Sequence, residues 1–274
     1  MPHVTASDGT NLHFSDEGTG LPVLCLAGLT RNGRDFDHVA PHLLALGVRL
    51  IRLDYRGRGA SDWADPASYT IPQEALDVVT LLDHLGLEKA AILGTSRGGL
   101  IAMMLAITAK DRLLGVALND IGPEIDPAGL SVIKDYIGRN PPQKTHEEAA
   151  QFRAKAWSHF KGVPHARWLA EVRAHYDATP DGLIINYDPK LRDAVLEAGA
   201  QPTPDLWPLY DALSGLPLAI LRGDASDLLL KTTYEKMRNR RPDAHAAQVT
   251  GRGHVPFLDE PEALSVLTDW IRDL

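Results

Sequence analysis

Short runs of almost entirely apolar residues alternate along the chain with segments whose apolar residues recur at helical spacing. The apolar runs are residues 22–26, 48–53, 90–93, 114–118 and 217–221. The segments with helical spacing are residues 36–46, 72–85 and 100–110. A strand that is buried on both faces of a sheet carries apolar side chains at nearly every position, so the runs predict such strands. Their alternation with helices predicts a mostly parallel sheet that carries helices on both faces.

The two ends of the chain extend this pattern. Residues 4–16, with Asp8 and Gly9 in the middle, predict an antiparallel hairpin. Residues 246–249 predict one more strand. Residues 261–274 predict a last helix, with Asp259 as its N-terminal cap.

The middle of the chain breaks the alternation. Residues 122–208 contain helical patterns, turns and many aromatic side chains, but no convincing buried strand. We therefore predict an α/β core formed by residues 1–121 and 209–274, with residues 122–208 as a helical cap insertion. We expect the aromatic side chains to form mainly the core of this insertion and in part the lining of an apolar pocket.

Charge and composition narrow the class of partner. The net charge of -8, without a basic face, argues against a nucleic-acid partner, and we interpret the run Arg238, Arg240 and Arg241 as a solvated helix end. The longest apolar stretch, residues 100–109, is about half of what spans a bilayer, which argues against a membrane partner. One cysteine, Cys25, and an acidic N-terminal stretch without a long apolar run predict a cytoplasmic protein. The sequence leaves the oligomeric state open.

A glycine-flanked serine follows one of the predicted strands. Residues 94–98 read Gly-Thr-Ser-Arg-Gly, and a predicted helix comes next. A serine held on a sharp turn between a strand and a helix has an exposed hydroxyl, and the glycines leave room for the neighbouring backbone. The N-terminal amides of the helix favour a developing negative charge. We therefore predict that Ser96 is a catalytic nucleophile.

A serine hydroxyl needs a general base, and the base needs an acid that orients it. Among 11 histidines, His254 lies in a glycine-rich loop between a predicted strand and the last helix, which places it at the same sheet edge as Ser96. Three aspartates compete as the acid. Asp227 has room to reach across its loop and is preferred, Asp224 is better placed to bond the turn itself, and Asp120 at the end of another strand is the third candidate. The predicted triad is Ser96, His254 and Asp227.

Two backbone N–H groups are expected to stabilise the oxyanion. One is that of Arg97, the residue after the nucleophile. The other comes from the loop after the strand at residues 22–26, where Gly28 permits a turn and Leu29 is the best placed donor. Two further histidines, His159 and His165, lie in the insertion as candidates for substrate contact.

With these residues in place, the chain resembles the α/β-hydrolase superfamily over nearly its whole length. The motifs that carry the resemblance are residues 94–99 (GTSRGG), 54–62 (DYRGRGASD), 222–227 (RGDASD) and 251–256 (GRGHVP). The resemblance implies an eight-stranded α/β-hydrolase core, a cap inserted after the sixth strand, and no metal or organic cofactor. The chain departs from the family in one place, since Ala27–Gly28 stands where the family commonly has His-Gly before the oxyanion hole.

Three functions remain open. The first is a serine hydrolase that cleaves a small ester, lactone or similar acyl substrate through an acyl-enzyme. The second is a carbon–carbon bond hydrolase of aromatic-ring cleavage products, which uses the same triad and for which Arg31, Arg97 or Arg153 is a candidate partner of the substrate carboxylate. The third is a non-catalytic member of the fold that binds a small molecule. Ser96 argues against the members of the superfamily that use an aspartate nucleophile.

Overall fold

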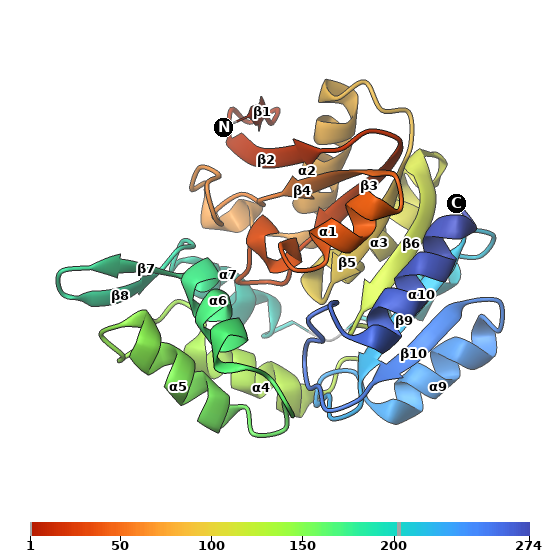
Figure 1. The fold of residues 1–274 in the computed structure, drawn as a ribbon. Helices are drawn as coiled ribbons and strands as arrows, with labels where there is room; N and C mark the ends of the chain where they lie inside the picture. Colours follow the sequence, from red (N-terminus) through yellow and green to blue (C-terminus); the bar gives the residue numbers. More distant parts are fainter. Residues whose placement is uncertain (1, 202–203) are drawn as a thin grey trace.

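The computed structural model describes residues 2–201 and 204–274, so residue 1 of the predicted core and residues 202–203 of the predicted insertion lie outside the description. Its main sheet has eight strands in the order β1-β2-β4-β3-β5-β6-β9-β10 (Figure 1). The strands are β1 (His3–Thr5), β2 (Asn11–Glu17), β3 (Leu21–Leu26), β4 (Val48–Leu53), β5 (Ala90–Thr95), β6 (Leu113–Asn119), β9 (Leu218–Gly223) and β10 (His245–Val249). Within this sheet, the pairs β1–β2 and β2–β4 are antiparallel, and the other described pairs are parallel. The predicted α/β-hydrolase fold with a mostly parallel eight-stranded sheet is confirmed.

The apolar strands are buried on both faces, as their composition predicts. In β3, Leu24 and Leu26 face one hydrophobic cluster while Val23 and Cys25 face the other. Successive side chains of a strand point to opposite faces, so a strand covered by helices on both sides is apolar at every position. The central strands therefore form a rigid platform whose carboxyl ends hold the loops described below.

Helices cover both faces of this sheet (Figure 1). The 3₁₀ turn η1 (Gly33–Phe36), α1 (Ala40–Ala45) and α10 (Pro261–Arg272) pack on one face. On the other face lie α2 (Ile71–His84), α3 (Arg97–Thr108), α8 (Trp207–Asp211) and α9 (Lys231–Arg240). Two more 3₁₀ turns, η2 (Pro66–Ser68) and η3 (Lys110–Arg112), lie in the connections. The helix predicted over residues 36–46 is shorter than expected, because Pro41 lies at its first turn and has no N–H to continue a helix from η1.

Most of the segment between β6 and β9 gathers at one end of the sheet, whereas α8 packs against α3 (Figure 1). It contains, besides α8, α4 (Pro127–Tyr136), α5 (His146–Ala156), α6 (His165–His175), β7 (Tyr176–Thr179), β8 (Gly182–Ile185) and α7 (Leu191–Ala198). The β7–β8 hairpin is antiparallel and adds two short strands to a range in which the sequence indicated no convincing buried strand. It escaped prediction because β7 has no buried position.

An aromatic cluster joins this segment to the rest of the molecule. Phe160 contacts Trp157, Trp168 and Phe257, with ring centroids 5.3–5.6 Å apart. Phe257 follows β10, so these aromatic side chains form a core between the segment and the loop that carries His254. The expectation that most aromatic residues of the insertion form its core is met only in part, because five of its eight aromatic residues line the cavity described below.

Two smaller predictions at helix ends are wrong. The N-terminal cap of α10 is Glu260, and Asp259 instead accepts a hydrogen bond from Arg167. The basic run at the end of α9 is only partly solvated: Arg238 and Arg240 are exposed, but Arg241 is buried and donates hydrogen bonds to the carbonyl groups of Leu213 and Leu216. In the part of the chain that the structure describes, every helix is too short or too polar to cross a membrane.

Candidate active site

Ser96 lies on a sharp turn between β5 and α3. Its φ of 50° and ψ of -112° fall in a region that residues other than glycine rarely adopt. The flanking glycines are required by close backbone approaches, since a Cβ atom at Gly98 would lie 2.0 Å from the carbonyl oxygen of Leu26. The turn holds the Ser96 side chain above the carboxyl end of the sheet, where it remains partly exposed.

The predicted base lies directly against this serine. The Ser96 Oγ atom is 2.9 Å from the Nε2 atom of His254. On the other side of the ring, Nδ1 is 2.7 Å from the Oδ2 atom of Asp120. A carboxylate only accepts, so Nδ1 carries a proton toward Asp120. In the neutral ring, Nε2 is therefore free to accept the proton of the Ser96 hydroxyl.

Asp120 is held rigidly at the end of β6. Its side chain is fully buried, and its φ of 56° turns the carboxylate toward His254. The backbone N–H of Gly223 donates to Oδ1 at 2.8 Å, and the Ser226 hydroxyl donates to Oδ2 at 2.6 Å. These contacts fix both oxygen atoms, so the carboxylate fixes the orientation of the imidazole.

The prediction that Asp227 is the partner of His254 is wrong. Asp227 lies exposed on the loop after β9, and its carboxylate makes no hydrogen bond within residues 2–201 and 204–274. Asp224 bonds its own turn region, since its Oδ1 atom accepts from the backbone N–H of Arg252 at 3.2 Å. From this loop, the Ser226 hydroxyl points toward the buried carboxylate of Asp120, and the two aspartates do not.

The two predicted oxyanion donors lie beside Ser96 and have free N–H groups. For neither Leu29 nor Arg97 does the backbone N–H meet an acceptor in the described part of the chain. Gly28 brings the loop close to the nucleophile, because a Cβ atom there would lie 3.9 Å from the Cβ atom of Ser96. The loop is tied to the start of α3 by a hydrogen bond of 3.1 Å from the N–H of Gly98 to the carbonyl of Ala27.

One buried carboxylate connects both donor residues. Glu74 of α2 is fully buried, and it accepts from Arg58 at 2.8 Å and from Arg97 at 2.6 Å. Arg58 in turn donates to the carbonyl oxygen of Leu29 at 3.0 Å. Burial alone would raise the pKa of Glu74, but the two guanidinium groups lower it, so the carboxylate is ionised. Glu74 therefore links the two loops that carry the N–H groups.

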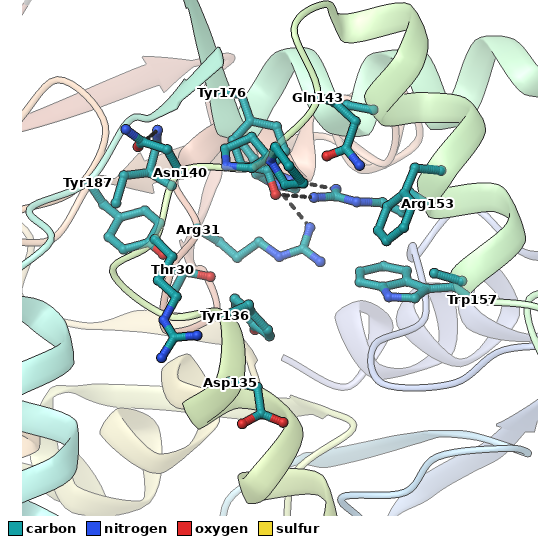
Figure 2. Close-up of a pocket in the computed structure, with 18 residues that line it drawn as sticks. Thr30, Arg31, Asp135, Tyr136, Asn140, Gln143, Arg153, Trp157, Tyr176 and Tyr187 are labelled. Carbon is teal, nitrogen blue, oxygen red and sulfur yellow. Dashed lines mark hydrogen bonds between the residues drawn. The ribbon is translucent and has the colours of Figure 1, made fainter. Parts of the chain in front are cut away.

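A cavity of about 340 Å³ opens beside the loop that follows β3 and contains Leu29 (Figure 2). Thr30 and Arg31, which follow Leu29 directly, form one wall, and residues of α4, α5 and β7–β8 form the others. Figure 2 shows that the side chains of Arg31 and Arg153 extend toward each other from opposite sides.

The structure separates the candidates for substrate contact. Arg31 and Arg153 line the cavity, whereas the side chain of Arg97 is engaged by Glu74. The ring of His159 packs on Phe160, and the Nε2 atom of the exposed His165 lies 2.9 Å from Oε1 of Glu147. The histidine that does line the cavity is His175, which the sequence did not single out.

Comparison with known proteins places the chain among hydrolases. The model of the Alpha/beta hydrolase family matches residues 23–265. The chain is 36% identical over 263 residues to the 3-hydroxybutyrate-oligomer hydrolase of Cupriavidus necator, which covers 92% of this chain and 89% of that protein. Among solved structures, an alpha/beta hydrolase from Novosphingobium aromaticivorans superposes with a TM-score of 0.91 at 36% identity and covers 100% of this chain and 98% of its own. A putative hydrolase from Rickettsia typhi gives a TM-score of 0.85 at 26% identity, with 97% and 92% covered.

Proposed function

Because this chain belongs to the alpha/beta hydrolase family and is a hydrolase, we propose that it cleaves small carboxylic esters through an acyl-enzyme on Ser96. One observation carries the proposal, namely the continuous line of hydrogen bonds from Ser96 through His254 to the buried Asp120. In this proposal Asp120 takes the role of the acid that was predicted for Asp227.

The reaction begins when His254 takes the proton of the Ser96 hydroxyl and the oxygen attacks the ester carbonyl. The carbonyl oxygen becomes negative and is stabilised by the N–H groups of Leu29 and Arg97. His254 then gives its proton to the leaving alcohol, and the acyl group stays on Ser96. A water molecule that loses its proton to His254 attacks this acyl-enzyme and releases the acid. The proton returns to Ser96, so the net change is one water consumed and one ester split.

The cavity has a mainly apolar lining that also contains Arg31 and Arg153, which suits a short ester with one polar end. We propose that residues 122–208 act as a cap, because α4, α5 and the β7–β8 hairpin of this range enclose the space beside Leu29. The relative from Cupriavidus necator hydrolyses 3-hydroxybutyrate oligomers according to its name, and such oligomers are short esters of a hydroxy acid. A dimer or trimer of 3-hydroxybutyrate is therefore the first substrate to test.

The test is the release of 3-hydroxybutyrate from its dimer, followed by chromatography. We expect turnover by the wild type and a loss of at least about 10³-fold in S96A. S214A is the matched control, because Ser214 is an exposed serine in the turn after α8, and it should retain wild-type turnover. Equal turnover by S96A and wild type would contradict the proposal. Turnover of a vinylogous diketone without turnover of any ester would favour carbon–carbon bond cleavage, and saturable binding without turnover would favour a binding protein.

A further inference from the structure

Arg153 of α5 holds its guanidinium group in the cavity with only neutral partners. Nη1 is 3.1 Å from Nδ1 of His175, and Nη2 donates to the Tyr176 hydroxyl at 3.1 Å. The guanidinium carbon lies 5.0 Å from the centre of the Trp157 ring and 5.4 Å from that of Tyr176. Aromatic faces stabilise a cation but do not neutralise it. The guanidinium group therefore forms no ion pair in the described residues, although it is near enough to the Glu171 carboxylate to interact with its charge.

His175 is neutral, which makes it an acceptor for Arg153. Its Nε2 atom lies 2.7 Å from Oδ1 of Asp35, so this nitrogen carries the proton and donates it to the carboxylate. Burial, together with the nearby Arg31 cation, lowers the pKa of His175. At neutral pH the ring therefore presents the lone pair of Nδ1 to Arg153 and adds no charge of its own.

The other cations of the cavity differ from Arg153. Arg31 is 2.9 Å from Glu171 and 3.5 Å from Asp35, so two carboxylates balance its charge. Arg139 also lines the cavity, but its side chain is exposed to solvent. Within residues 2–201 and 204–274, Arg153 forms no ion pair and is partly buried.

A guanidinium group has five N–H donors. Two of them bind His175 and Tyr176, which leaves three without a partner in the described residues. A partly buried cation with unused donors is best satisfied by an anion that accepts two parallel hydrogen bonds, and a carboxylate has this geometry.

We propose that Arg153 binds a free carboxylate of the substrate and selects esters that carry one. This inference rests on the proposed ester hydrolysis at Ser96. The cavity wall formed by Thr30 and Arg31 begins one residue after Leu29, and adjacent Cα atoms are about 3.8 Å apart. Ser96 and His254 do not line the cavity, so the proposal requires a substrate that extends from the N–H group of Leu29 past Thr30 into the cavity. Arg153 is a specificity-determining residue in this arrangement.

The test compares two substrates of equal size. One is the 3-hydroxybutyrate dimer, and the other is the same dimer with its terminal carboxylate replaced by a carboxamide. We expect the wild type to prefer the carboxylate by about 10- to 100-fold in kcat/KM, the range for a hydrogen-bonded charge. R153Q should reduce this preference to less than about threefold, and R153K should keep part of it, because lysine keeps the charge without the planar fork. R173Q removes an exposed arginine of the neighbouring α6 and should keep the wild-type preference.

Failure of this inference is distinct from failure of the proposed function. A wild type that cleaves both dimers equally well, or an R153Q variant that keeps the full preference, would overturn the carboxylate site while leaving ester hydrolysis intact. If the wild type cleaves neither dimer, calorimetric titration with 3-hydroxybutyrate decides the inference. Binding by the wild type and its loss in R153Q, at an unchanged melting temperature, would support the site, and no binding by the wild type would overturn it.

Discussion

Replacing Asp120 by asparagine reverses the proton pattern along the line of hydrogen bonds. In the wild type, Oδ1 accepts from the N–H of Gly223, and Oδ2 accepts from Ser226 and His254. The amide oxygen of asparagine must stay with Gly223, because that N–H requires an acceptor. The NH₂ group then faces Nδ1 of His254, which becomes an acceptor, and the ring proton moves to Nε2. A protonated Nε2 does not accept the proton of Ser96.

The size of the loss follows from this change of tautomer. The same replacement in a Ser-His-Asp triad lowers kcat by about 10⁴-fold. That factor corresponds to about 5 kcal/mol in activation free energy. Substrate contacts are untouched in this variant, so we expect KM to change by less than about threefold. The fold should persist, because asparagine has the shape of aspartate and keeps the hydrogen bond to Gly223.

The assay measures steady-state hydrolysis of the 3-hydroxybutyrate dimer by D120N and by D227N. Asp227 is exposed and makes no hydrogen bond among the described residues, so D227N should keep kcat within about threefold of the wild type. Thermal melting of both variants controls for loss of fold. A large loss of kcat in D227N together with a near-normal D120N would refute the assignment of Asp120.

Three further perturbations test the surroundings of the site. E74Q removes the negative charge that pairs with both Arg58 and Arg97. We expect a loss of about 3–5 kcal/mol in unfolding free energy, measured by urea unfolding. Steady-state kinetics should show a fall in kcat that exceeds any change in KM. Burial alone would raise the pKa of Glu171, but Arg31 and further arginines lower it. Its stabilising effect is therefore full above its ordinary pKa of about 4.3 and is lost as the pH falls through the lowered value. The stability deficit of E171Q in pH-dependent melting should therefore be constant above about pH 5 and shrink below it, and a deficit that grows toward acid would contradict this sign. W168A should cost about 3–5 kcal/mol in urea unfolding, since its buried ring fills the aromatic cluster, and a loss below about 1 kcal/mol would show that the cluster is not a core.

The parts of the site that lie directly after buried strands were predictable from the sequence. Ser96 follows β5, and its flanking glycines stand where neighbouring backbone leaves no room for a side chain. His254 lies in a glycine-rich loop after β10, and the carboxyl ends of parallel strands meet at one edge of the sheet. These features depend on the local glycine motifs and on the direction of the strands, and both can be inferred from a single sequence.

The choice of the acid depended on loop conformation instead. In the register of β5 and β6, Thr95 pairs with Asn119, so Ser96 and Asp120 leave the sheet side by side. That neighbourhood was the available signal for Asp120. The loop after β9 contains two aspartates, and the sequence pattern alone favours either of them as the acid. The structure shows that this loop instead donates a hydrogen bond from the Ser226 hydroxyl to Asp120.

The cavity was the least predictable part for a related reason. His175 ends α6, and its hydrogen-bond partner Asp35 lies 140 positions away in the sequence. Contacts over such separations are set by packing of the segment between β6 and β9, and no period along the chain encodes them. The β7–β8 hairpin that supports one cavity wall was missed because β7 has no buried position.

Covalent labelling tests most directly the claim that Ser96 is the nucleophile. The protein is incubated with a fluorophosphonate, and the adduct is located by intact mass and peptide mapping. We predict one adduct per chain on the peptide that contains Ser96, no adduct in S96A, and wild-type labelling in S214A. An S96A variant that is labelled as fast as the wild type would contradict the account.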